Sequence, residues 1–308
     1  MSETPKPRFA SGFVSILGRP NSGKSTLLNK LVGMKVAIVA PKPQTTRTSI
    51  QGVLNLPEAQ VVFVDTPGIH KPDSLINRRM LDVVRTALDQ KDLLLYVVDS
   101  TRRLSDEDRE AVELVRSART PALLLLNKID ALKDKRALLD LIGSFKSFHE
   151  FEEYLPISAL TGAGLDQLRA QLVQRLPEGP AYFPPDYITD QPERFLAAEF
   201  IRERILRETH DEVPHSVATT VDQWRETEQL TRISATIYVE RDSQKGIIIG
   251  AKGAMLKKIG SGARREMETF FGRKIFLELF VKVRPKWREN REFLDAVDWR
   301  SMTGRKVE

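Results

Sequence analysis

One stretch of eight residues constrains this chain more than any other: positions 18–25 read Gly-Arg-Pro-Asn-Ser-Gly-Lys-Ser. This is the phosphate-binding loop pattern: a glycine, four residues of any kind, a second glycine, a lysine, and a serine or threonine. Gly18 and Gly23 allow a tight turn that brings backbone N–H groups against phosphate oxygens. Lys24 supplies positive charge to the β- and γ-phosphates, and the Ser25 hydroxyl is placed to bind Mg²⁺. An apolar run precedes the loop and a helical pattern follows it, so we predict a strand, loop and helix that bind a nucleotide.

The composition is that of an ordinary soluble protein. The chain has 308 residues, of which 41% are hydrophobic and 29% are charged, and this length suits two domains with separate cores. It contains no cysteine, so disulfides and thiolate metal sites are excluded. No apolar run approaches the roughly 18 residues that a membrane span needs, and the start of the chain lacks the apolar core of a secretory signal. We expect a cytoplasmic protein.

Residues from about 12 to 176 alternate apolar strands with amphipathic helices. This rhythm is typical of a mostly parallel, doubly wound α/β sheet. Each polar motif in the region follows an apolar run, and ligands of such sheets bind at the carboxyl ends of the strands. We therefore predict a nucleotide-binding domain over 1–177. The prolines that follow favour an extended backbone and predict a semi-rigid linker over 178–192.

Two of these motifs sense the phosphate and select the base. Residues 65–68 read Asp-Thr-Pro-Gly; Asp65 can approach Mg²⁺ through water, and the Gly68 N–H can meet the γ-phosphate. Residues 127–130 read Asn-Lys-Ile-Asp, and the Asp130 carboxylate can accept hydrogen bonds from both N1–H and the exocyclic amino group of guanine. Adenine presents neither donor in that arrangement. The motif therefore favours GTP over ATP.

A second, smaller α+β domain is expected over 193–286. Its predicted elements are a helix, two strands, two helices and a strand, over about 193–208, 217–221, 233–239, from 254, 261–271 and 275–283. Residues 241–288 hold 13 Lys/Arg against 4 Asp/Glu, a net +9, which favours a polyanionic partner. Within them, residues 250–253 read Gly-Ala-Lys-Gly and resemble the signature loop of a type II KH domain, which clamps a single-stranded nucleic-acid backbone.

The motifs of the first domain resemble those of translation-factor-type GTPases. Taken with the second domain, the chain resembles the Era family of bacterial ribosome-assembly GTPases from about residue 10 to 285. This resemblance implies GTP hydrolysis with Mg²⁺, binding to the 3′ end of 16S ribosomal RNA, and a role in maturation of the 30S subunit. It also places a first switch at 44–48, with Thr46 as the second protein ligand of Mg²⁺ and the neighbouring Thr45 as the alternative. We expect a monomer.

Residue 69 bears on the mechanism of hydrolysis. Many GTPases carry a glutamine there to orient the attacking water, whereas this chain has Ile69, which forms no side-chain hydrogen bond. The resemblance implies a subclass in which K⁺ supplies extra positive charge between the phosphates, with Asn21 as its side-chain ligand. The alternative is that Asn21 only shapes the turn. His70 is a weaker candidate for a catalytic base, since a lone loop histidine is more often a solvated bystander.

The candidate site residues form four groups. We expect GTP contacts from Gly18, Asn21, Ser22, Gly23, Lys24, Ser25 and Thr26 at the phosphates, Gln44, Thr45 and Thr46 in the first switch, Asp65, Thr66, Pro67 and Gly68 in the second, and Asn127, Lys128, Asp130, Ser158 and Ala159 around guanine. Lys24, Thr46 and Gly68 are the expected catalytic residues. Ser25, Thr46 and, through water, Asp65 are the expected Mg²⁺ ligands. We expect RNA contacts from Gly250, Ala251, Lys252, Gly253, Lys257 and Lys258.

Other functions remain open at this stage. A membrane-associated signalling GTPase would turn the basic segment toward anionic lipid on the inner face of the plasma membrane. A protein-interaction module is a third possibility for the second domain, which the intact glycine loop disfavours. A tandem GTPase is disfavoured because the chain has a single phosphate loop. Residues 1–10 and the tail over 287–308 carry no motif that we can place.

Overall fold

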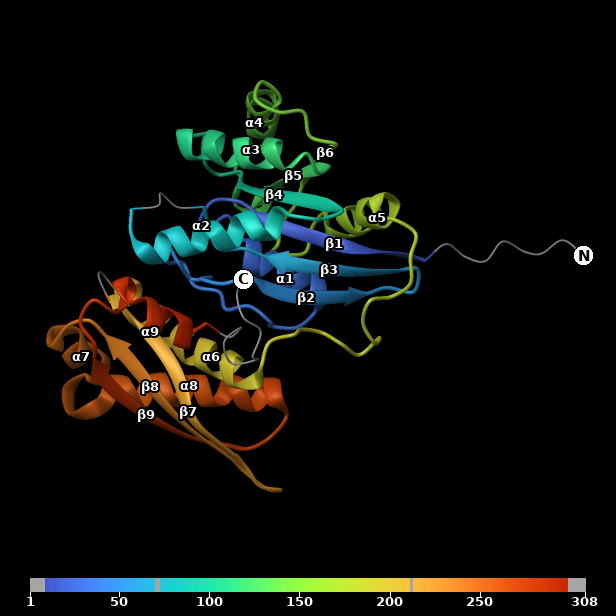
Figure 1. The fold of residues 1–308 in the computed structure, drawn as a ribbon. Coiled ribbons are helices and arrows are strands. Elements are labelled where there is room, and N and C mark those ends of the chain that lie inside the picture. The colour runs from blue at the N-terminus through green and yellow to red at the C-terminus, as the bar shows by residue number, and fades with distance from the viewer. Residues whose placement is uncertain (1–8, 70–72, 211–212, 299–308) are drawn as a thin grey trace, which may run out of the picture. The chain divides into compact units, whose positions relative to one another are not determined.

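The computed structural model describes residues 9–69, 73–210 and 213–298, and their contacts form two compact units (Figure 1). The first unit comprises Met1–Ala37, Thr46–Lys71 and Arg79–Asp190, and the second comprises Ile38–Thr45, Pro72–Arg78 and Gln191–Glu308. Each unit has a sheet and an apolar core of its own. Two short excursions from the first half of the chain therefore pack with the second unit.

The first unit is built on a six-stranded sheet in the order β2-β3-β1-β4-β5-β6. Neighbouring strands are parallel, except that β2 runs antiparallel to β3. The strands are β1 (Ala10–Leu17), β2 (Ile50–Asn55), β3 (Ala59–Asp65), β4 (Leu93–Asp99), β5 (Ala122–Asn127) and β6 (Glu153–Pro156). The helices are α1 (Lys24–Val32), α2 (Leu75–Leu88), α3 (Asp106–Ala118), α4 (Ala137–Lys146) and α5 (Leu165–Arg175), and the first turn of α2, up to Arg78, belongs to the second unit by its contacts. The predicted α/β class is confirmed.

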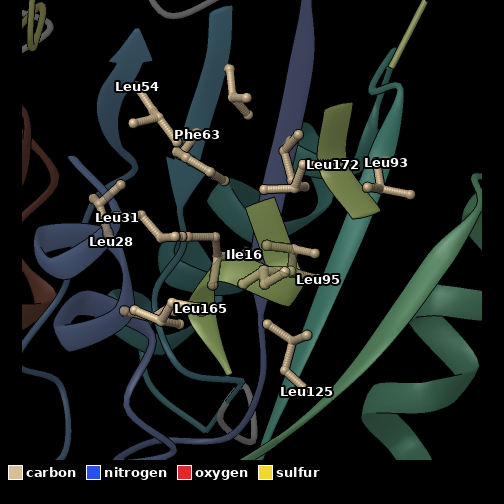
Figure 2. Close-up of a cluster of buried hydrophobic side chains, with 14 of the residues drawn as sticks. Ile16, Leu28, Leu31, Leu54, Phe63, Leu93, Leu95, Leu125, Leu165 and Leu172 are labelled. Atoms are coloured by element: carbon tan, nitrogen blue, oxygen red, sulfur yellow. The ribbon is translucent and has the colours of Figure 1, made fainter. Parts of the chain in front are cut away.

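Helices cover both faces of this sheet, each face through its own apolar cluster. Figure 2 shows part of one cluster, in which Ile16 of β1 and Leu95 of β4 lie among leucines of α1 and α5. The other cluster joins Tyr96 of β4 to residues of α2, α3 and α4. Because β1, β4 and β5 are buried on both faces, their sequences are near-continuous apolar runs.

The proline-rich stretch after α5 forms hydrogen bonds with β2 and β3 of the sheet. The Gln60 side chain, 1% exposed, accepts hydrogen bonds from Tyr182 N–H at 2.7 Å and Phe183 N–H at 2.9 Å. Further along, Val53 N–H of β2 donates to the carbonyl of Ile188 at 2.8 Å. Contacts of this kind assign the stretch to the first unit as far as residue 190.

The second unit has a three-stranded sheet in the order β7-β8-β9, with β7 antiparallel and β9 parallel to β8. Its apolar core joins this sheet to α6 and α8. The elements are α6 (Glu193–Glu208), β7 (Ala218–Glu226), β8 (Thr231–Val239), α7 (Asp242–Ile249), α8 (Ala254–Phe271) and β9 (Ile275–Val283). Helix, two strands, two helices and a strand is the order predicted for a type II KH domain.

One prediction within this unit is wrong. We expected two helices after the glycine loop, separated near residue 261, but α8 is continuous and the other helix, α7, precedes the loop. A Cβ added to Gly260 would lie 3.3 Å from Leu279 of β9, and one on Gly262 would lie 2.4 Å from the Arg204 side chain of α6. These glycines therefore let α8 approach its neighbours closely instead of ending it.

The chain beyond β9 also packs on the second unit, through a short turn at Trp287–Glu289 and α9 (Arg291–Ala296). Trp287 is 1% exposed and donates from Nε1 to the carbonyl of Ser216 at 2.9 Å. The Phe293 ring lies 4.9 Å from that of Tyr238 on β8. The part of the tail up to α9 is thus part of this domain's packing, while residues 1–8 and 299–308 lie outside the described residues.

Candidate nucleotide and RNA sites

The phosphate-binding loop joins β1 to α1. Gly18 and Gly23 have φ angles of 147° and 100°, in the region that favours glycine. A Cβ on Gly18 would lie 2.2 Å from the Val97 carbonyl oxygen, and one on Gly23 would lie 2.3 Å from the Asn127 side chain. Lys24, 6% exposed, donates from Nζ to the Gly18 carbonyl at 3.0 Å. The loop therefore has the tight backbone and buried cation that a phosphate cradle needs.

Three side-chain oxygens from three parts of the first unit converge next to this loop. Ser25 Oγ, at the start of α1, lies 2.9 Å from Thr46 Oγ1 and 2.6 Å from Asp65 Oδ2 at the end of β3. The other carboxylate oxygen, Asp65 Oδ1, is buried with no hydrogen-bond partner among the described residues. Oxygen ligands of this kind are those that Mg²⁺ prefers, and it usually keeps several of its waters. The residues therefore fit the predicted hydrated Mg²⁺.

The structure separates the two threonines of the first switch. The Thr45 hydroxyl donates to the carbonyl of Lys42 at 2.6 Å, whereas the Thr46 hydroxyl reaches Ser25. The preceding residue, Gln44, donates from its side chain to Asn77 Oδ1 at 2.9 Å. Thr46 is thus the threonine that lies at the site.

Burial sets the proton affinities of the two charged groups here. It lowers the pKa of Lys24 to about 8, although the nearby Asp65 charge opposes the shift. It raises the pKa of Asp65 to about 6, against the opposing effects of Lys24 and of the hydrogen bond from Ser25. Each charge is costly in the free protein, and a bound phosphate or cation would compensate it.

This raised pKa predicts how Mg²⁺ binding depends on pH. Below about pH 6 the nucleotide-free protein carries a proton on Asp65 that a hydrated cation must displace, so Mg²⁺-dependent binding of a GTP analogue should weaken by up to about tenfold per pH unit. Above that value the affinity should level off until Lys24, whose pKa is about 8, begins to lose its proton. Mg²⁺ titrations between about pH 5 and about pH 8 measure this. Asp65→Asn is the control, because it retains the titrations of Lys24 and of the nucleotide's own phosphates but lacks that of Asp65; a parent curve parallel to it would contradict the prediction.

The residues predicted to recognise guanine lie together at the ends of β5 and β6. Asn127 donates from Nδ2 to the Ser22 carbonyl at 2.8 Å and accepts a hydrogen bond from Ala159 N–H at 2.9 Å. Ser158 Oγ donates to Asp130 Oδ1 at 2.5 Å. Asp130 is exposed, and this hydrogen bond orients its carboxylate. Asn127 therefore connects the phosphate loop to the loop that is predicted to contact the base.

Two residues next to this site, Asp99 and Arg19, were not predicted from the sequence. Asp99, at the end of β4, pairs with Lys128 Nζ at 2.7 Å; burial opposes its charge, but hydrogen bonds from Lys128 and Thr101 hold the pKa of Asp99 below its usual value. Arg19 of the phosphate loop pairs with Asp108 of α3 at 3.1 Å. Asp99 ends an apolar strand, as the recognised motifs do, and could have been found. Arg19 and Asp108 are 89 residues apart in sequence, so no local sequence pattern predicts that they form an ion pair.

The second switch lies against the phosphate loop where β3 ends. The Thr66 hydroxyl donates to a carbonyl of β1 at 2.8 Å, and a Cβ on Gly68 would approach Pro20 of the loop to 2.8 Å. Ile69 packs on the apolar cluster formed with α2, α3 and α4. The Ile69 side chain therefore contributes to packing, and it has no group that could form a hydrogen bond to the attacking water. His70 lies outside the described residues.

The glycine loop of the second unit connects α7 to α8. Gly250 and Gly253 have φ angles of 70° and 79°, and Lys252 between them is exposed with a φ of 50°. A Cβ on Gly250 would lie 2.7 Å from Met255, whereas nothing lies within 4 Å of one on Gly253. Gly253 is also the N-cap of the 18-residue helix α8. The loop thus exposes backbone and a helix N-terminus, both suited to phosphate.

A groove of about 370 Å³ adjoins this loop. Its lining residues are Gly253, Leu256, Lys257, Gly260, Ser261, Arg264, Leu277 and Leu279. Of the two lysines predicted to bind RNA on α8, Lys257 lines the groove, while Lys258 pairs with Glu208 of α6 at 2.5 Å. Sequence reasoning missed the leucines and Arg264, because they meet only when β9 packs beside α8. Apolar and basic side chains that line one groove suit bases and phosphates respectively.

Known families match both halves of the chain. Residues 13–128 match the family described as 50S ribosome-binding GTPase, and residues 212–288 match the KH domain. The curated protein GTPase Era of Geobacter metallireducens is 51% identical over 301 residues, which span 97% of this chain and 100% of that protein. GTPase Era of a Nostoc species is 48% identical over 295 residues, or 96% of this chain and 91% of its own length.

Solved structures agree along the same length. An Era variant of Aquifex aeolicus bound to GDP and AlF4⁻ superposes with a TM-score of 0.92 at 40% identity, covering 94% of this chain and 99% of that one. Era in complex with MgGDPNP and nucleotides 1506–1542 of 16S ribosomal RNA gives the same TM-score, 0.92, at 40% identity. Within the residues that the structure describes, no helix is long and apolar enough to cross a membrane. With half of its residues shared along nearly its whole length, this chain belongs to the Era family of GTPases.

Proposed function

We propose that the protein is a GTP-hydrolysing switch that binds the 3′ end of 16S ribosomal RNA and acts in assembly of the 30S subunit. The observation that carries the proposal is the convergence of Ser25, Thr46 and Asp65 beside a buried Lys24. In switch GTPases, loops held by the γ-phosphate and Mg²⁺ are released after hydrolysis. The RNA follows from the similar Era structure that contains nucleotides 1506–1542 of 16S ribosomal RNA.

The residues of the nucleotide site would bind either the phosphates or Mg²⁺. The backbone N–H groups of 18–25 cradle the phosphates, and Lys24 neutralises charge that develops on the β–γ bridge. Ser25, Thr46 and, through water, Asp65 would hold Mg²⁺, which supplies further charge neutralisation at the phosphates when bound. The Gly68 N–H is available to the γ-phosphate, and loss of that phosphate would release both switches.

Hydrolysis should be slow, because Ile69 packs in the apolar cluster and cannot orient water. If K⁺ supplies the missing charge, turnover should be several-fold faster in K⁺ than in Na⁺ at equal ionic strength. The Asn21 side chain is exposed on the loop with a φ of 62°, a conformation that asparagine tolerates. Phosphate release in the two salts measures the difference, and Asn21→Ala should remove most of it. Equal rates in both salts would contradict a role for K⁺.

The RNA half of the proposal rests on the groove beside Gly253. Its leucines offer apolar contact to splayed bases, and Lys257 and Arg264 offer charge to the backbone. Crosslinking the protein to cellular RNA, followed by sequencing, tests the partner. Reads concentrated at the 3′ end of 16S ribosomal RNA are expected, and an even spread over cellular RNA would contradict the proposal.

A ribosomal partner implies the cytoplasm. Peripheral contact with the inner face of the membrane is the second proposal for the basic segment, and no structural observation favours it. Sedimentation with anionic liposomes, in competition with RNA, separates the two. Liposome binding that RNA does not displace would require a lipid surface outside the groove.

A further inference from the structure

One helix of the second unit holds the backbone of the first switch. Residues 38–45, which precede Thr46, belong to the second unit by their contacts. Ile38 and Ala40 are 2% and 9% exposed and are part of that unit's apolar core, together with α6. The start of the segment is therefore packed in the core of the second unit, before the chain reaches Thr46.

Two buried charges on α6 make polar contacts with this segment, in addition to Arg207, which donates to the Val39 carbonyl at 3.1 Å. Arg202, whose side chain is 3% exposed, donates to the Gln44 carbonyl at 3.3 Å and also to the Thr45 carbonyl. Glu203, 0% exposed, accepts a hydrogen bond from Val39 N–H at 3.1 Å. Arg202 and Glu203 lie among the buried apolar residues of α6, and a charge in such surroundings is costly unless it is paired. These pairs hold the two ends of the segment.

The Arg202 guanidinium is itself oriented. Glu199, one turn earlier on α6, accepts from its Nε at 2.7 Å and from its Nη2 at 2.6 Å. The two-point pair fixes the plane of the guanidinium, which leaves its other N–H groups aimed at the carbonyls. Gln44 has a φ of 58°, a left-handed conformation that costs free energy for a residue other than glycine. The contact with Arg202 is one of those that hold the backbone in this conformation.

We propose that Arg202 is a positioning residue for GTP, which fixes the Gln44 and Thr45 carbonyls so that the Thr46 hydroxyl is presented to the Mg²⁺ site. The inference rests on the proposed GTPase function and deepens it. Thr46 contributes when a γ-phosphate and Mg²⁺ order the first switch, whereas GDP lacks the γ-phosphate. Arg202 therefore favours GTP over GDP, and through it the KH domain contributes to nucleotide selectivity.

The test compares nucleotide affinities in variants of the full-length chain. Arg202→Ala should raise the Kd for a non-hydrolysable GTP analogue roughly tenfold while the Kd for GDP stays within about twofold of the parent. It should also raise the Mg²⁺ concentration needed for half-maximal analogue binding. Arg202→Lys keeps a charge beside Glu199 but cannot donate in two fixed directions, so it should recover only part of the loss. The lysine variant carries the test if the alanine variant fails to fold.

The matched control is Arg204→Ala on the same helix, because Arg204 faces Gly262 and Glu266 of α8 instead of the switch segment. It should leave the ratio of GTP-analogue to GDP affinity unchanged, whatever its melting temperature. The inference is overturned if Arg202→Ala leaves that ratio unchanged, or if Arg204→Ala shifts it equally. A parent protein that binds neither nucleotide would instead refute the proposed function.

Discussion

Asp130→Asn should convert the protein from a GTP-binding into a xanthosine triphosphate-binding protein. The Asp130 carboxylate is predicted to accept hydrogen bonds from both guanine donors, and an asparagine amide offers one acceptor and one donor in place of its two acceptors. Loss of one partner of a desolvated charged hydrogen-bond pair costs about 2–5 kcal/mol, so GTP should bind at least about 30-fold more weakly. Xanthine carries an oxygen where guanine carries the amino group, and this oxygen can accept from the new amide.

Competition binding of GTP and xanthosine triphosphate measures the switch in preference. Ser158→Ala is the matched control, because it removes the hydrogen bond to Asp130 but leaves the carboxylate. It should weaken both nucleotides modestly and keep the preference for GTP. If Asp130→Asn bound GTP as tightly as the parent, residues 127–130 would not be the guanine motif.

Most of the nucleotide site could be predicted because its signals are local. The phosphate loop and the motifs at 65–68 and 127–130 are each contiguous, and each follows an apolar strand whose carboxyl end must lie at the same edge of the sheet. The choice between Thr45 and Thr46 could not be made this way. Adjacent residues differ only in where their side chains point, and the motif itself does not determine that.

Residues joined by packing alone left no such signal. Arg202 is the tenth residue of α6, a helix that the sequence predicts from its apolar spacing. Nothing nearby in sequence shows that the partners of Arg202 are the carbonyls of residues 44 and 45. The groove beside the glycine loop likewise combines α8 with the leucines of β9. The break expected near residue 261 is absent from α8. Glycines close together in sequence can end a helix or allow close packing, and only the neighbours of Gly260 and Gly262 distinguish the two.

Gly253→Asp should abolish RNA binding while leaving the free protein folded and able to bind GTP. Gly253 caps α8 and lines the groove, and a Cβ there meets nothing within 4 Å. Aspartate tolerates the left-handed backbone better than most residues, so the main effect is a negative charge where a phosphate must approach. Juxtaposed like charges cost several kcal/mol, which corresponds to a loss of roughly 100-fold or more in RNA affinity. Gly250 is unsuitable for this test, because a Cβ there would collide with Met255.

Two control variants show whether a loss of RNA affinity in Gly253→Asp comes from its negative charge, from backbone strain or from its position on α8. Gly253→Asn has the shape of the aspartate variant without its charge and should lose much less affinity. Gly272→Asp adds the same charge at the other end of α8, where φ is 66° and a Cβ also meets nothing within 4 Å, and it should bind RNA within about twofold of the parent. Titrations with a 3′-terminal 16S fragment must be made at one salt concentration, since phosphate contacts are strongly salt-dependent. RNA binding by Gly253→Asp equal to that of Gly272→Asp would move the RNA site away from this loop, and the basic charge of residues 241–288 would then act elsewhere on the domain.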